Sequence, residues 1–226
     1  MALSRSTHSL WLTRGAVLGA ALLLCAPLAF LAISPGEVAP GLWPHVASVM
    51  LPRALAQTAA LLVGVGAIAL VLGIGFAWAV TRHEFPGRRW LEWALALPLA
   101  FPAYVLAYVY VAGLSFSAAP ARAWRAIGLP ADAFPEVRSL VGACVVLGLA
   151  LFPYVYLMMR ASLMRHGSAA FDAARMLGAS PRQAFLRVVM PATRVAWLGA
   201  LGLVLLETLA DFGAVKMLGR DTLTTL

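Results

Sequence analysis

Long apolar runs constrain this chain more than any other feature, because they recur along much of its length. About twenty consecutive apolar residues are enough for a helix to cross the hydrocarbon core of a bilayer. Polar or proline-rich stretches separate five such runs, at about residues 15–33, 54–80, 90–116, 139–159 and 195–213. The sequence therefore predicts an all-α fold, a polytopic membrane helix bundle with about five spans.

The balance of charge agrees with a membrane protein and excludes most soluble classes. Only 12% of the residues are charged and 62% are hydrophobic, whereas a soluble domain has about a quarter charged residues. The net charge of +8 is expected from arginines retained on one side of a membrane, and nucleic-acid binding is not expected. Cys25 and Cys144 both fall inside apolar runs and are interpreted as small buried hydrophobes.

The distribution of basic residues predicts the orientation. With the N-terminus in the cytoplasm, the inner segments hold eleven arginines and the outer segments hold six basic residues. This excess favours a cytoplasmic N-terminus and a retained first span rather than a cleaved signal peptide. The polar stretch between the fourth and fifth runs is then cytoplasmic. Five spans with a chain end in mid-loop lead us to expect a fragment, or one half of something longer.

That polar stretch carries the start and stop signals of two short helices. Residues 168–177 favour a helix, and Gly178 can end it in the left-handed conformation. Ser180 is a good N-cap, Pro181 suits the first helical position, and Gln183 completes a capping box. We expect two apolar surfaces here, whose residues are Phe171, Ala174, Met176 and Leu177 for the first and Phe185, Val188 and Val189 for the second. On these features alone, an ordinary loop with interfacial helices and a knob that docks into another protein are both open.

The same stretch resembles the cytoplasmic signature of permease subunits in binding-protein-dependent ABC importers. That signature reads E-A-A, three residues, G, nine residues, I-x-L-P. This chain has the matching residues at the same spacing, namely Asp172, Ala173, Ala174, Gly178, Val188, Met190 and Pro191. Asp replaces Glu, Val replaces Ile and Met replaces Leu, and each exchange keeps charge or apolarity.

The resemblance implies a fold, a set of partners and a place in the cell. It implies a multi-pass protein of the bacterial inner membrane, with residues 1–50 as an N-terminal span and periplasmic loop and residues 51–226 as an incomplete permease core. The segment 165–191 would couple the permease to a cytoplasmic dimer of ATP-binding subunits. A periplasmic substrate-binding protein and a second permease half, fused or separate, would complete the importer. Mg-ATP would bind the partner, and this chain would bind no cofactor itself.

Three further stretches resemble ferric-iron importer permeases in particular. They are "LPLAFPAYVLAYVY" (97–110), "FPYVYLMMRAS" (152–162) and "ETLADFGAVKMLGRDTLTT" (207–225). In that branch two halves are often fused, so this chain would be the first half, and iron would be the substrate. Related permeases for thiamine, sulfate, polyamines or phosphonates share the architecture and stay open as alternatives.

Glu207 and Asp211 are the two carboxylates of the fifth run, four residues apart. Intramembrane carboxylates usually face the protein interior or a water-filled path. One interpretation is that the pair lines the translocation path of a cationic substrate. The other is an interhelical hydrogen bond or a position at the membrane interface.

Two other classes of function have less support. An intramembrane enzyme needs a nucleophile with its base or a metal site, and neither G-x-S-x-G nor H-E-x-x-H occurs, so no catalytic residue is assigned. The histidines are scattered and the tyrosines are interpreted as packing residues, so no metal site is assigned either. An ion-coupled secondary transporter would use Glu207 and Asp211 directly. No G-x-x-x-x-G-K-[ST] loop is present, which agrees with ATP hydrolysis by a separate subunit.

Overall fold

The computed structural model describes residues 46–115, 118–130, 134 and 136–219, and every regular element within them is helical. By its internal contacts the chain divides into two units, Met1–Val49 and Met50–Leu226. The apolar run expected at 15–33 lies outside the described residues. Helices α3 to α12 (residues 51–217) all lie within the second unit.

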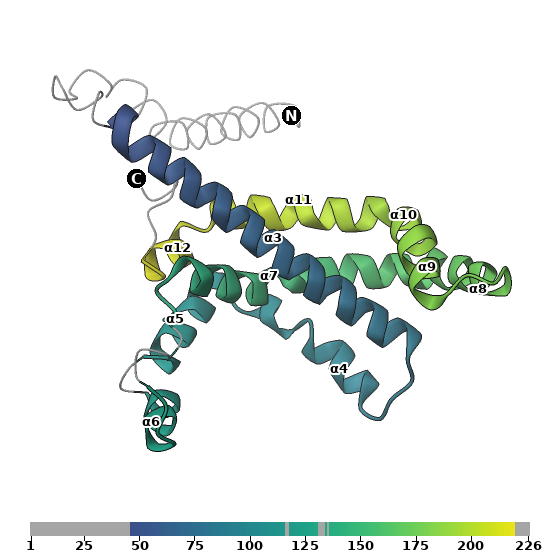
Figure 1. The fold of residues 1–226 in the computed structure, drawn as a ribbon, viewed down its shortest axis with the longest axis horizontal. Coiled ribbons are helices and arrows are strands. Elements are labelled where there is room, and N and C mark those ends of the chain that lie inside the picture. The colour runs from purple at the N-terminus through teal and green to yellow at the C-terminus, as the bar shows by residue number, and fades with distance from the viewer. Residues whose placement is uncertain (1–45, 116–117, 131–133, 135, 220–226) are drawn as a thin grey trace, which may run out of the picture. The chain divides into compact units, whose positions relative to one another are not determined.

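Three helices form the core of this unit (Figure 1). Helix α3 (Leu51–Arg82) packs chiefly against α7 (Leu140–Ser162), and α11 (Arg194–Ala210) packs against both. The α3–α7 interface includes two rings, Phe76 and Phe152, whose centroids lie 5.7 Å apart. Because these helices correspond to three of the predicted apolar runs, the sequence located the core of the bundle correctly.

Small residues allow α3 and α7 to approach closely, as expected for helices packing in a membrane. A Cβ placed on Gly73 would lie 2.5 Å from Val155 Cβ and 2.9 Å from the backbone nitrogen of Tyr156. A Cβ on Gly148 would lie 2.6 Å from Ile68 Cγ2. Gly75, two residues further along α3, instead faces open space, since nothing lies within 4 Å of an added Cβ there.

The run at 90–116 is not one straight helix. It contains α4 (Arg88–Ala94), the 3-10 helix η3 (Leu97–Ala100) and α5 (Ala103–Gly113). The α4–η3 part and α5 meet at an angle of 99°. The bend falls where Pro102 precedes α5, because a proline cannot donate the backbone hydrogen bond that would continue a helix. The expected third span is therefore a broken span or a re-entrant segment.

The fifth run is also not one straight helix. Helix α11 ends at Ala210, Asp211 caps the short helix α12 (Phe212–Met217), and α12 packs against α5. Before α11, the helical segment Pro181–Ala192 meets it at 70°. Among the described residues, Val46–Arg82 and Leu140–Arg165 are long and apolar enough to span a membrane, and the number becomes four if each bent pair counts as one span.

The remaining elements connect these helices. Helix α6 (Ala119–Ala126) lies in the connection between α5 and α7. After α7, the π-helical segment η5 (Leu163–Gly167) leads into α8 (Ser168–Met176). Helix α9 (Pro181–Ala184), the π-helical η6 (Phe185–Val189) and α10 (Met190–Ala192) then lead to α11. The sequence did not predict the π-helical segments, which no simple residue signal marks.

Candidate functional site

The polar stretch folds as the predicted helix, glycine turn and second helix. Gly178 has a φ of 88°, in the left-handed region that favours glycine. The capping box is present: the backbone N–H of Gln183 donates to Ser180 Oγ (3.3 Å), and the backbone N–H of Ser180 donates to Gln183 Oε1 (3.0 Å). We call residues 168–192 the helical hairpin. The local sequence signals alone account for its turn.

Aromatic packing attaches the helical hairpin to the end of α3. The Trp78 ring lies edge-on to Phe171 of α8 and to Phe185 of η6, with centroid distances of 5.0 and 4.7 Å. The Arg82 guanidinium lies 4.5 Å from the centre of the Phe171 ring, a cation–π contact. Both arms of the hairpin therefore contact the same turn of α3.

The acidic residue of the signature also faces α3. Asp172 forms an ion pair with Arg82, and the second contact of the pair, Arg82 Nη1 to Asp172 Oδ2, is 3.4 Å. Sequence reasoning assigned Asp172 to coupling but did not find Arg82 as its partner, because ninety residues separate them. The side chain thus joins the hairpin to the same end of α3 as the aromatic contacts do.

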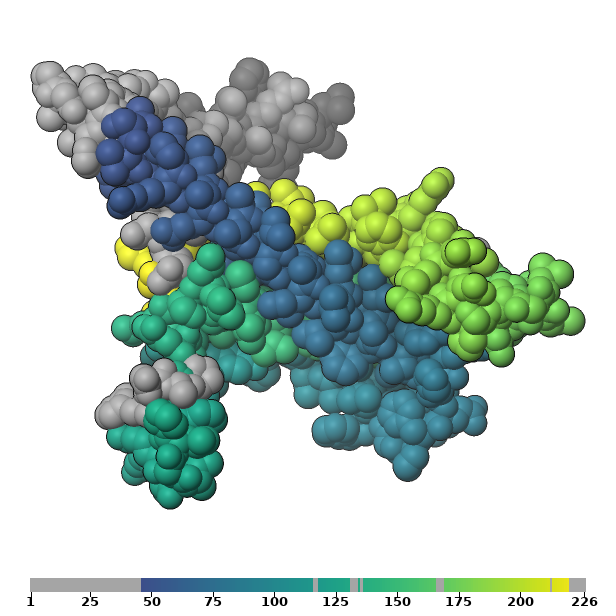
Figure 2. All heavy atoms as spheres, viewed as in Figure 1, coloured from purple at the N-terminus to yellow at the C-terminus, as the bar shows by residue number. Residues whose placement is uncertain are grey.

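The turn exposes two large apolar side chains. Met176 is 88% and Leu177 is 89% exposed, whereas Phe171 and Ala174 are buried. The expectation that these four residues make one surface was wrong, because α8 turns Phe171 and Ala174 toward the bundle while Met176 and Leu177 lie at its free end. In the space-filling view the hairpin stands out from one end of the α3–α7–α11 bundle (Figure 2).

The other signature residues divide between the two environments. Ala173, Gly178 and Pro191 are exposed, whereas Val188 and Met190 are half-buried and pack against the core. Phe185 also packs there, and Val189 is fully buried, so the second expected apolar surface faces the bundle. The apolar half of the signature therefore packs the hairpin against the bundle, while the turn stays exposed.

Glu207 lies at a different place, beside the break between η3 and α5. It lines a cavity of about 270 Å³ together with residues of the break and of α7, among them Phe101, Pro102 and Tyr154. Asp211 does not line this cavity. Its Oδ1 accepts a hydrogen bond of 2.8 Å from the backbone N–H of Ala214, so it caps α12. The two carboxylates do not share one helix face, because α11 ends between them.

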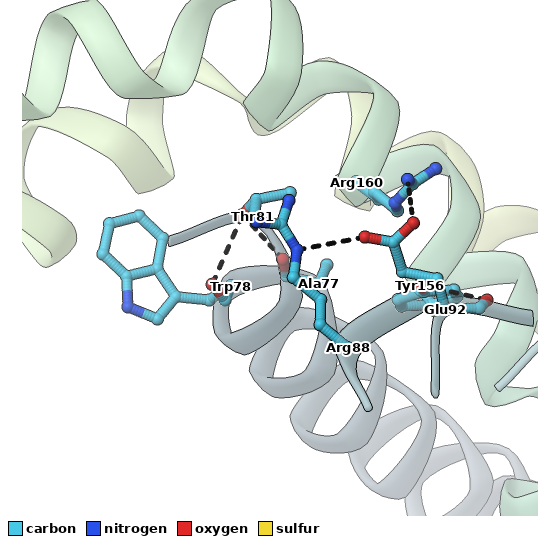
Figure 3. Close-up of polar contacts among 7 residues, drawn as sticks. All are labelled: Ala77, Trp78, Thr81, Arg88, Glu92, Tyr156 and Arg160. Atoms are coloured by element: carbon cyan, nitrogen blue, oxygen red, sulfur yellow. Dashed lines mark hydrogen bonds and ion pairs between the residues drawn. The ribbon is translucent and has the colours of Figure 1, made fainter. Parts of the chain in front are cut away.

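Sequence reasoning missed a third carboxylate, Glu92 of α4. Its two oxygens accept from Arg88 Nε at 3.1 Å and from Arg160 Nη2 at 2.9 Å, and Tyr156 Oη donates to its backbone oxygen at 3.3 Å (Figure 3). The charges of Arg88 and Glu92, four residues apart on a helix, were the signal that could have found it. This network joins α4 to α7. Within the described ranges, no group of three or more His, Cys, Asp or Glu side chains is placed to hold a metal ion.

Known proteins resemble this chain over most of its length. Residues 69–226 match the family model "Binding-protein-dependent transport system inner membrane component". The Fe(3+)-transport system permease protein FbpB 2 of Haemophilus influenzae is 30% identical over 218 residues, which are 95% of this chain and 38% of that protein. The sulfate transport system permease protein CysW of Escherichia coli K12 is 34% identical over 148 residues, 66% of this chain and 49% of that protein.

The probable sulfate transport system permease protein cysT of Nephroselmis olivacea is also similar, at 30% identity over 67% of this chain and 51% of that protein. The chain thus spans about half the length, or less, of these relatives. Iron and sulfate proteins both occur among them, so the likeness does not distinguish the two. The chain belongs to the family of binding-protein-dependent transport system inner membrane components, which are multi-pass permeases of the inner membrane.

Proposed function

We propose that the helical hairpin couples this permease to a separate ATP-binding subunit in the cytoplasm. The observation that carries the proposal is the contrast within the hairpin. Both arms are fixed on α3 through Trp78, while Met176 and Leu177 lie almost fully exposed at the turn. A rigid element with an exposed apolar end suits a groove on a partner. Closure of the partner, driven by Mg-ATP, would then be passed to α3 and the bundle.

The test of coupling uses the exposed turn. We expect Met176→Glu and Leu177→Glu to leave the thermal stability of the permease unchanged, because both side chains already face solvent. The same variants should lose copurification with the ATP-binding subunit, since a charge in an apolar groove is costly. Arg187→Glu, an exposed position on η6 away from the turn, is the matched control. Copurification that survives both turn variants would contradict the docking assignment.

A second test concerns the backbone of the turn. Gly178→Val forces a β-branched residue to a φ of 88°, which the handedness of L-residues disfavours by about 1–2 kcal/mol. Nothing lies within 4 Å of an added Cβ, so the cost is conformational rather than a clash. Gly178→Asn is the control, because asparagine tolerates the left-handed region. We expect Gly178→Val to weaken association with the ATP-binding subunit and Gly178→Asn to retain most of it.

For the substrate, we infer ferric iron, delivered by a periplasmic binding protein to a path completed by a second permease half. The similarity to FbpB 2 over 95% of the chain supports iron. The similarity to CysW supports sulfate as the second candidate. The cavity beside Glu207 favours a cation, because a carboxylate there would repel sulfate.

Uptake of radiolabelled ferric iron and sulfate by cells that express the full-length importer separates these candidates. Iron uptake that requires ATP hydrolysis and falls in Glu207→Gln would support both the substrate and a path role for Glu207. A matched Asp211→Asn variant removes a charge that does not line the cavity, and it keeps the cap of α12 because asparagine accepts the same hydrogen bond, so we expect it to leave uptake unchanged. ATP-dependent sulfate uptake without iron uptake would refute the iron assignment and leave the coupling proposal standing.

A further inference from the structure

A second cavity lies at the arginine-rich end of the bundle, beside Trp78 and Arg82, which contact the helical hairpin. It has a volume of about 170 Å³. The residues that line it are Trp78, Thr81, Arg82, Arg88, Arg160, Leu163 and Met164. These residues come from α3, α4, α7 and η5. The cavity is distinct from the turn proposed for coupling and from the cavity beside Glu207.

The charge around this cavity is unbalanced. Three guanidinium groups line it, those of Arg82, Arg88 and Arg160. Only two carboxylates pair with these three groups. Glu92 pairs with both Arg88 and Arg160, and Asp172 pairs with Arg82. One positive charge is therefore left without a matching negative charge. The side chains of all three arginines are about one-third exposed, so an anion can approach them from solvent.

One hydrogen-bond donor in this group is also unused. Arg160 donates to Glu92 through Nη2, but its Nε is buried and finds no hydrogen-bond acceptor in the part of the chain that the structure describes. A buried donor without an acceptor loses free energy relative to the same donor in water. A small rotation of the Arg160 side chain toward the cavity would let an oxygen atom of a bound anion satisfy it. Arginine recognises carboxylate and phosphate oxygens through paired N–H donors, so the missing acceptor fits an oxyanion.

Apart from Thr81, the remaining wall of the cavity is apolar. Trp78, Leu163 and Met164 contribute it, and Met164 is 63% exposed. Arg82 and Arg160 stand where the apolar stretches of α3 and α7 end, which is where lipid headgroups meet a spanning helix. The volume equals that of several water molecules at about 30 Å³ each, enough for a phosphate group. Basic pockets between spanning helices are typical sites of anionic headgroups.

From these observations we propose that the cavity lined by Arg82, Arg88 and Arg160 binds a phosphate group. The phosphate comes from the headgroup of an anionic lipid or from phosphate in solution, and the same guanidinium groups would hold either. Bound there, it would contact α3, α4 and α7 at once and neutralise the excess charge beneath the hairpin. The proposal does not depend on the substrate or on ATP coupling.

The test places the full-length protein in phosphatidylcholine nanodiscs with a rising fraction of phosphatidylglycerol. Native mass spectrometry then counts the lipid retained per protein, with and without excess inorganic phosphate. We expect preferential retention of phosphatidylglycerol, and about a tenfold loss of its affinity in Arg88→Gln, since one charge-assisted contact is removed. Arg89→Gln is the matched control, because Arg89 is the next residue of α4, is exposed and does not line the cavity.

Each outcome decides the matter. Retention that falls in Arg88→Gln but not in Arg89→Gln supports the site, and displacement by inorganic phosphate tells whether free phosphate also occupies it. Equal retention of both lipids with no phosphate bound, or equal loss in the two variants, would overturn the proposal in favour of diffuse surface attraction. If Arg88→Gln fails to fold by thermal unfolding, the variant Arg160→Gln removes one guanidinium group while Glu92 stays paired with Arg88, and retained phosphatidylglycerol affinity there would equally overturn it.

Discussion

At the scale of single residues, two kinds of contact fix the helical hairpin on α3, and they differ in strength. The Arg82–Asp172 ion pair is exposed, with 54% of the Asp172 side chain accessible, and exposed pairs contribute about 0–1 kcal/mol. Trp78 is half-buried and contacts two rings. Each aromatic pair contributes roughly 0.5–1.5 kcal/mol beyond the area it buries. Packing of Trp78 is therefore expected to dominate.

This contrast can be measured with two substitutions. We expect Trp78→Ala to lower the free energy of unfolding by roughly 2 kcal/mol or more, since a large ring is removed from a partly buried site. Asp172→Asn should lower it by less than about 1 kcal/mol, and added salt should reduce even that difference. Thermal unfolding of the purified protein in detergent, followed by circular dichroism, gives both values. A larger loss for Asp172→Asn than for Trp78→Ala would contradict this ranking.

Residue signals predicted what is local and missed what is distant. Gly178, Ser180 and Gln183 lie within six positions, and their geometry follows from backbone conformation and capping alone. Glu92 and Arg160 are 68 positions apart, so no short window contains both. For Asp211, the role depends on where a helix ends. Because α11 ends at Ala210, Asp211 caps α12 and does not continue α11.

At the scale of elements, the closeness of α3 and α7 depends on which face of α3 carries a glycine. Gly73 faces α7, where an added Cβ would meet the side chain of Val155 and the backbone of Tyr156. Gly75 lies two residues further along the same helix, and an added Cβ there meets nothing within 4 Å. The two positions therefore form a matched pair with opposite expectations.

We expect Gly73→Ala to lower stability by about 1–3 kcal/mol, because a backbone contact cannot yield as a flexible side chain can. Gly75→Ala should be neutral or slightly stabilising, since alanine is a better helix former by up to about 1 kcal/mol. Unfolding of both variants under identical detergent conditions checks the pair. Equal effects at the two positions would show that Gly73 does not set the distance between α3 and α7.

The helices themselves were predicted better than their shapes. Apolar runs identified α3, α7 and α11, since length and hydropathy suffice for a spanning helix. The prolines of the run at 90–116, Pro98 and Pro102, are residues that kink or break a helix, but they do not determine the angle of 99°. Whether such a segment continues straight or turns back depends on what packs beside it, here α7 and α12. That information lies in other parts of the chain.

At the scale of the whole molecule, the arginine distribution predicts a cytoplasmic N-terminus and hence opposite sides for the two ends of α7. Ile127, in the turn after α6, is 73% exposed, and Met176 at the end of α8 is 88% exposed. If α7 crosses the bilayer once, these two residues face different compartments. The prediction assigns Ile127 to the outside and Met176 to the cytoplasm.

Cysteine labelling tests this assignment. Single cysteines at Ile127→Cys and Met176→Cys are introduced after Cys25 and Cys144 are replaced by alanine. We expect a membrane-impermeant maleimide to label Ile127→Cys in spheroplasts with an intact inner membrane, and Met176→Cys only after permeabilisation. The reverse pattern would invert the topology and place the helical hairpin outside, where no ATP-binding subunit could reach it.

The pairing of α3 with α7 also bears on how the protein is made. The partner that α3 packs against most is completed roughly 80 residues after α3 ends. Bacterial ribosomes add about 5–20 residues per second, so α3 waits about 4–16 seconds in the membrane before α7 is finished. During that interval the glycine face at Gly73 lacks its native neighbour. A chaperone or insertase that shields this face would act in those seconds. It would have to dissociate from the surface around Gly73 before α7 packs there.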